Sequence, residues 1–140
     1  MAVSRDQIFD RVPIYMIFLG QHAQDAVRRS GPCSVDEGEL VAARLRIRRE
    51  EVAAVDRGAL SYAATDRTIH QEALKYRDEC RAAKRPMDPA VVASFTDRRI
   101  MQVAAVFADL KSQLLPQSYA ALGVFIEQCF ATGLHSMKPR

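Results

Sequence analysis

The stretch "VDRGALSYAATDRTIHQEALKYRDECRAA", residues 55–83, decides the fold of this chain. Apolar and small residues recur in it at alternating spacings of four and three, which is the period of one helix face. The seam consists of Val55, Ala59, Tyr62, Asp66, Ile69, Ala73, Tyr76, Cys80 and Ala83. Gly58 does not interrupt it. The pattern predicts one long helix from about residue 48 to about residue 84.

Similar stripes predict helices on both sides of this stretch. The first helix is expected from about residue 5, with Gly31 and Pro32 ending it. A short helix follows through "GELVAARLRI", residues 38–47, and its continuity with the long helix is left open. Asp88 as N-cap and Pro89 as the first helical residue predict another helix, which ends at Leu115. Pro116 then begins the last helix.

The chain shows no strand-like alternation, and its connections between helices are short. Short connections place consecutive long helices side by side in opposite directions. We therefore predict an all-α fold, an antiparallel up-and-down bundle of four to five helices with one long central helix. Its 140 residues are expected to form a single helical domain, residues 1–140.

Composition restricts the class of protein. The 49% hydrophobic and 26% charged residues indicate a soluble globular chain rather than a disordered one. The longest apolar run, Val12–Gly20, is too short for a transmembrane segment, which needs roughly 20 residues. The net charge is only +3, and acids interrupt the arginine run "RLRIRREE". We therefore expect no nucleic-acid partner.

Three cysteines, Cys33, Cys80 and Cys129, have no metal-binding spacing. In an up-and-down bundle the ends of the long helix and of the last helix lie at the same pole. If the protein is oxidised, we expect a disulfide between Cys80 and Cys129, with Cys33 left free.

The seam of the long helix contains a carboxylate, Asp66, with His70 one turn further on. Two other seams carry a polar residue near their middles, His22 in the first helix and Arg99 in the fourth. A buried charge needs a partner, and Arg99 and His22 are the candidates for Asp66. Three interpretations stay open: a structural ion pair that fixes helix register, a splayed seam in which Asp66 reaches water, or a polar layer that lines a ligand pocket.

The candidate ligand-binding residues are those of this polar layer and two tyrosines of the same seams. They are His22, Asp66, His70, Arg99, Tyr15 and Tyr62. An aromatic stripe is more often core than a ligand box. The sequence has no Glu-x-x-His pair, no His-Glu-x-x-His, no glycine-rich phosphate loop and no Gly-x-Ser-x-Gly elbow. We therefore predict no catalytic residue, metal or cofactor.

Three segments, "IFDRVPIYMIFL" (8–19), "EEVAAVDRGALSYAATD" (50–66) and "LKSQLLPQSYAALGVFIEQ" (110–128), resemble small helical domains that environmental bacteria encode with secretion signals. The element "LLPQS" is similar to the "LTPEQ" element of Spy-like periplasmic chaperones and related metal-resistance proteins. It keeps the proline and glutamine but lacks the threonine and glutamate. The resemblance implies an exported helical binding module and transfers no site residue.

The leading functional hypothesis is a non-enzymatic helical binding or interaction module whose ligand is a protein or a small molecule. We expect an extracytoplasmic location if a leader was removed, and a cytoplasmic one otherwise. An apolar first helix also leaves open a homodimer surface. The alternative is a small enzyme or metal-binding sensor that uses His22, Asp66 and His70 in the bundle interior.

Overall fold

The computed structural model describes the backbone of residues 5–31 and 36–137, and the side chains of residues 12–31 and 36–130. All regular structure in these ranges is helical. The elements are α1 (Arg5–Arg29), α2 (Gly38–Leu45), the short 3-10 helix η1 (Arg49–Glu51), α3 (Val52–Ala82), α4 (Pro89–Gln113) and α5 (Pro116–Met137). The predicted all-α bundle with one long central helix is confirmed. No helix in the described ranges is long and apolar enough to cross a membrane.

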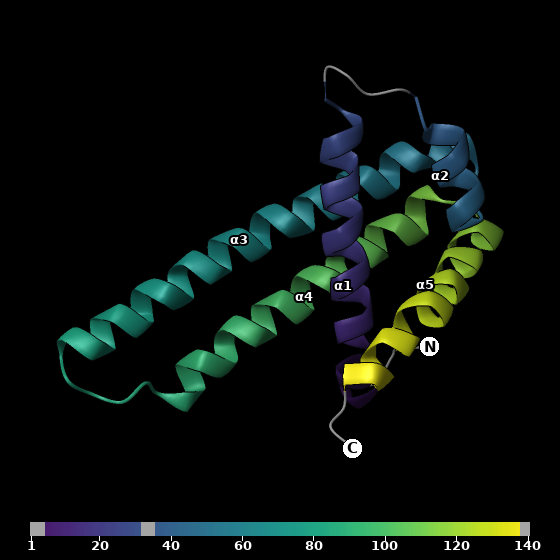
Figure 1. Ribbon diagram of the computed structural model, residues 1–140. Coiled ribbons are helices and arrows are strands. Elements are labelled where there is room, and N and C mark those ends of the chain that lie inside the picture. Colours follow the sequence, from purple (N-terminus) through teal and green to yellow (C-terminus); the bar gives the residue numbers. More distant parts are fainter. Residues whose placement is uncertain (1–4, 32–35, 138–140) are drawn as a thin grey trace.

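The long helix α3 and helix α4 form an antiparallel hairpin, and its tip projects well beyond the other helices (Figure 1). The turn forms as the sequence predicts. The Asp88 carboxylate caps α4 by accepting a hydrogen bond of 2.9 Å from the backbone N–H of Ala90. The hydroxyl of Tyr76 accepts the backbone N–H of Asp88 at 2.8 Å, so the cap is tied back to α3.

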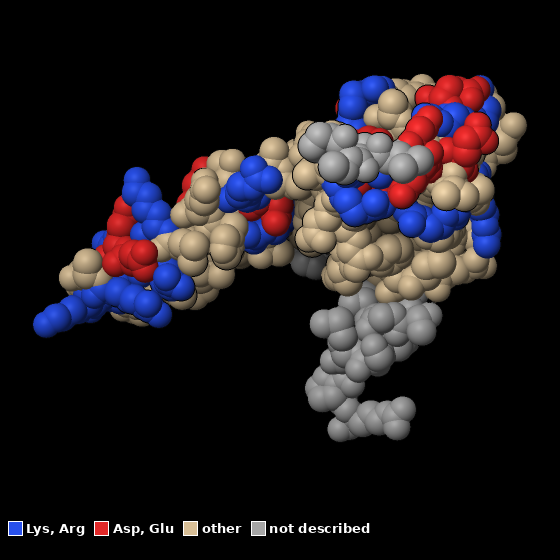
Figure 2. Space-filling view, turned by 45° about the horizontal axis from the view of Figure 1, so that its top comes forward, with Lys and Arg blue, Asp and Glu red and all other residues tan. Residues whose placement is uncertain are grey.

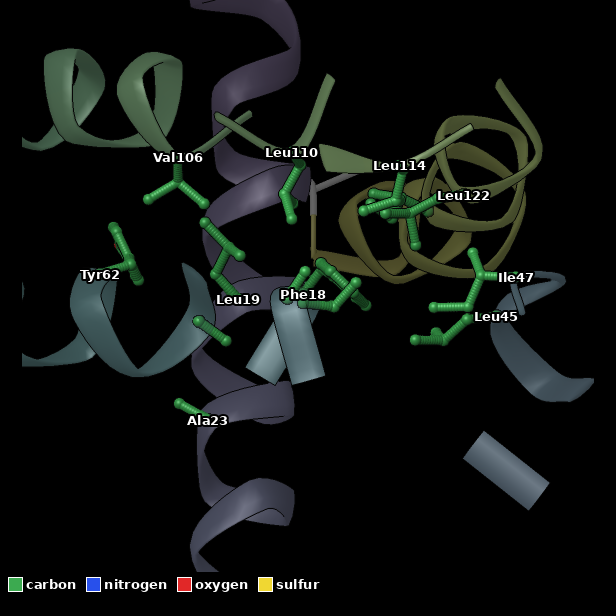
Figure 3. Packing of buried hydrophobic residues seen from close by; sticks show 14 of the residues in the cluster. Phe18, Leu19, Ala23, Leu45, Ile47, Tyr62, Val106, Leu110, Leu114 and Leu122 are labelled. Carbon is green, nitrogen blue, oxygen red and sulfur yellow. The ribbon is translucent and has the colours of Figure 1, made fainter. Parts of the chain in front are cut away.

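Helix α1 crosses the base of this hairpin steeply and packs against α3, α4 and α5 (Figure 1). It continues through Pro13, although proline cannot donate a backbone hydrogen bond. Phe18 and Leu19 of α1 lie in the middle of the hydrophobic core, with Leu110 of α4 and Leu122 of α5 close by (Figure 3). The core is therefore concentrated where α1 meets the base of the hairpin.

The close approach of α3 and α4 depends on Gly58. A Cβ atom added at this residue would lie 3.0 Å from Cγ1 of Val106, closer than side-chain carbons normally pack. Two turns along α3, the carboxylate of Asp66 meets the guanidinium of Arg99 on α4. Arg98 and Glu72 form a further ion pair between the two helices, more toward the tip. Glycine at position 58 thus lets the two helices converge at the base of the hairpin.

Helices α2 and α3 are separate, which settles the boundary that the sequence leaves open. Arg46 adopts a left-handed conformation with φ of 63°, and its backbone ends α2. The carboxylate of Glu51, at the start of α3, accepts backbone N–H groups of both Arg48 and Leu115 at 2.8 Å. Glu51 therefore fixes the junction between α4 and α5 to the start of α3.

The predicted disulfide between Cys80 and Cys129 is not formed, and both cysteines are free thiols. The prediction assumed that α5 runs back along the α3–α4 hairpin. Instead, α5 leaves the hairpin at its base and packs on α1, so its end lies far from the hairpin tip that carries Cys80 (Figure 1). Cys33 lies outside the described residues.

Candidate functional site

The carboxylate in the α3 seam, Asp66, is paired with Arg99. Nε of Arg99 donates to Oδ1 of Asp66 at 2.7 Å. The Asp66 side chain keeps 41% of its surface exposed and Arg99 keeps 24%, so the pair lies at the edge of the hairpin rather than inside it. The geometry is that of a cross-helix ion pair with access to water.

The buried histidine lies elsewhere and has a different partner. Nε2 of His22 is 2.6 Å from Oδ1 of Asp56, and the imidazole ring keeps only 1% of its surface exposed. Arg29 donates hydrogen bonds to the same carboxylate from both of its terminal nitrogens, at 2.8 and 3.0 Å. The second half of α1 is thereby fixed near the start of α3.

The electrostatics of this cluster favour an ionised Asp56. Burial alone would raise the pKa of Asp56, but the hydrogen bonds from His22 and Arg29 outweigh it and lower the pKa to about 2. Because Asp56 is then an acceptor only, His22 must be the donor through Nε2–H. Both oxygens of the Asp56 carboxylate are thus occupied, and the imidazole ring of His22 is almost completely covered.

The ion pairs continue from Arg29 toward the start of α2. Asp25 accepts Nε of Arg29 at 2.8 Å on one oxygen and Arg28 at 2.8 Å on the other. Arg28 also donates to Glu37 at 2.8 Å, before α2 begins. Figure 2 shows the result as acidic and basic side chains intermingled over the end of the molecule opposite the hairpin tip.

The remaining predicted site residues do not join this cluster. His70 is exposed on the hairpin. Tyr62 is buried beside Asp66, and burial together with that negative charge raises its pKa to about 12. Tyr15 packs edge-on against Phe107 at 4.9 Å. The structure thus brings Asp66, Arg99 and Tyr62 together, whereas His22 and Tyr15 have other partners. His70 lies one turn beyond Asp66 on α3, with its side chain exposed.

The three predicted metal ligands therefore do not form one metal site in the described part of the chain. His22 is bound to Asp56, Asp66 is bound to Arg99, and His70 is exposed. Across the described part of the chain, no group of three or more histidine, cysteine, aspartate or glutamate side chains is arranged to hold a metal ion.

A cleft with a volume of about 590 Å3 lies between α1, α2 and α5. Three phenylalanine rings form part of its wall, and Phe18 meets Phe130 and Phe125 edge-on at 5.7 and 6.4 Å. Its polar lining includes His22 and Asp25 of the ion-pair cluster. The lining residues are Ile17, Phe18, Gln21, His22, Asp25, Arg44, Leu45, Phe125, Cys129 and Phe130.

Helix geometry explains how the cleft is built. Phe18, His22 and Asp25 follow one another at spacings of four and three, so they share one face of α1. Phe125 and Cys129 are one turn apart on α5 and face them. Arg44 and Leu45 end α2, where the left-handed Arg46 turns the chain away. Each side of the cleft is thus a helix rather than a loop.

Sequence reasoning missed the residues that organise this region, namely Asp56, Arg29 and Arg44. Asp25 and Arg29 do carry a signal, because opposite charges four residues apart form ion pairs on a helix. Asp56 carries no such sequence signal, since it directly follows the seam residue Val55 and is not itself part of the seam.

Comparison with known protein families, with curated proteins and with solved structures finds no match to this chain.

Proposed function

We propose that this protein is a non-enzymatic binding module that holds a small molecule in the cleft between α1, α2 and α5. The observation that carries the proposal is the cleft itself. Its volume of about 590 Å3 falls within the roughly 300–1,000 Å3 of sites for small ligands, and its mixture of aromatic walls with a few polar groups is typical of them.

The state of the polar groups supports binding rather than catalysis. His22 is held by Asp56, and its ring is almost completely covered. Asp25 has both carboxylate oxygens engaged by arginines. These groups are fixed by one another and so hold one wall of the cleft in place. The resemblance of residues 114–118 to an element of exported helical binding proteins supports the same class and an extracytoplasmic location.

A cleft-filling substitution tests the proposal. Cys129 is exposed beside the cleft, so Cys129→Trp fills it from the rim without disturbing the core. Val92, which is 42% exposed on the distant hairpin, gives the control Val92→Trp. We expect a small-molecule library, screened by NMR, to yield ligands that bind the wild type and Val92→Trp but not Cys129→Trp. Ligands that bind all three proteins equally, or a library without any binder, would refute the assignment.

A further inference from the structure

The charged groups of the cleft differ in whether they already form hydrogen bonds with other side chains of the protein. Asp25 accepts hydrogen bonds from Arg28 and Arg29, one on each oxygen, both at 2.8 Å. Burial acts to raise the pKa of Asp25, but these two arginines outweigh it and lower the pKa. This carboxylate is therefore committed to the protein and offers little to a cationic ligand.

Arg44, at the last turn of α2, has no acidic side chain within hydrogen-bond distance among the described residues. Within the described residues its one acidic neighbour is Asp25, with Nη2 of Arg44 3.8 Å from Oδ2. That separation is too long for a hydrogen bond. The Arg44 side chain also keeps 55% of its surface exposed. Its guanidinium has five N–H donors and matches carboxylates and phosphates in a two-point geometry.

The wall facing Arg44 across the cleft is aromatic. Phe125 and Phe130 on α5 are 6.3 Å apart and meet at 75°, and both pack edge-on against Phe18. Such rings accept a further aromatic or apolar group in stacked or edge-to-face contact.

Resting on the proposed function, we infer that the ligand is a small organic anion with an apolar, preferably aromatic, body. Its negative group pairs with Arg44 at the end of α2. Its body packs against Phe125 and Phe130, which rest on the buried ring of Phe18. The charge of Arg44 selects the anion, and the phenylalanines select the apolar body.

Three probes that share one body but differ in charge test the inference. They are 4-phenylbutyrate, 4-phenyl-1-butanol and 4-phenylbutylamine, each titrated into the full chain up to millimolar concentration at pH 7 and low salt, with NMR shifts of the cleft residues as the readout. A charge-assisted pair with an arginine is worth about 1.5 kcal/mol or more, which is about tenfold in Kd. We expect the anion to bind at least tenfold more tightly than the alcohol, and the amine to bind most weakly.

Substitution of Arg44 provides a second test of the inference. Arg44→Gln should remove the advantage of the anion and leave the Kd of the alcohol unchanged. Arg67→Gln, at an exposed position of α3, removes the same charge away from the cleft and should keep the advantage.

Equal binding of anion and alcohol, tighter binding of the amine, or an anion advantage that survives in Arg44→Gln would each overturn the inference while leaving the cleft as a binding site. If no probe shifts the cleft residues, the proposed function falls as well.

Discussion

His22 on α1 donates to Asp56 on α3 across 2.6 Å, and this contact links two residues that are 34 positions apart in the chain. Arg29 secures the same carboxylate from one side, while the imidazole ring borders the cleft on the other. The cluster therefore connects the crossing of α1 over α3 to the shape of the proposed binding site.

Asp56→Asn should destabilise the protein strongly. The change leaves Arg29 without its two-point acceptor in a partly buried place, and it replaces a charged acceptor of His22 with a neutral amide. Breaking a largely buried ion pair typically costs about 3 kcal/mol. Urea unfolding measures the loss. Glu72→Gln, at an exposed ion pair of the hairpin, is the control and should cost less than about 1 kcal/mol. Equal losses for the two variants would contradict the structural role of Asp56.

The Asp66–Arg99 pair should contribute far less than the His22 cluster. Both partners are accessible to water, and accessible pairs are worth about 0.2–1 kcal/mol. A double-mutant cycle with Asp66→Asn and Arg99→Gln measures the coupling directly. A coupling near 3 kcal/mol would mean that the pair is buried, against the geometry described above.

Stability should fall in acid because of Glu51 and Asp56. Burial favours a higher pKa for Glu51, but hydrogen bonds from Ser118 and from the backbone of Arg48 and Leu115 outweigh it and lower the pKa to about 2. The folded pKa values of both carboxyls lie below the unfolded values, so their stabilisation is complete above about pH 5 and is lost as the pH falls toward 2.

Denaturant unfolding between pH 7 and pH 2 tests this dependence. Glu51→Gln should reduce the loss of stability over that range. Glu50→Gln, at the exposed neighbouring residue, should leave the loss unchanged. If the two variants show the same pH profile, Glu51 is not the titrating group.

Two glycine-to-alanine substitutions should change the stability of the protein in opposite directions. Gly58→Ala pushes a methyl group against Val106 and should destabilise by about 1 kcal/mol or more, as overpacking does. Gly20→Ala meets no atom within 4 Å and should stabilise by about 0.5–1 kcal/mol, because alanine is the better helix former. Thermal unfolding reports both. Stabilisation by Gly58→Ala would show that α3 and α4 are further apart than described.

The two described cysteines should differ in reactivity. Cys129 is exposed, whereas Cys80 keeps only 1% of its surface accessible. Brief alkylation of the native protein, followed by peptide mass spectrometry, should modify Cys129 well before Cys80. Recovery of a Cys80–Cys129 disulfide peptide from protein kept without reductant would contradict the path of α5.

The helices could be predicted from the sequence because their signals are local. The α3 seam follows from spacing alone, and the start of α4 follows from Asp88 and Pro89. Arg99 could be named as a partner for Asp66 because both lie on the facing seams of consecutive helices.

The path of α5 could not be predicted, since it depends on contacts between distant residues such as Glu51 and Leu115, 64 positions apart. The cleft could not be predicted for the same reason. Its walls come from α1, α2 and α5, and helical periodicity does not say at what angle such helices cross.

Intermolecular NOEs between 4-phenylbutyrate and the protein test the central claim most directly. The claim is that the cleft between α1, α2 and α5 is the ligand site. We expect NOEs from the phenyl protons to the rings of Phe125 and Phe130. A second apolar groove, lined by Tyr15, Phe107 and Tyr119, is the natural competitor. NOEs to those three rings, with none to Phe125 or Phe130, would show that the cleft is not the ligand site.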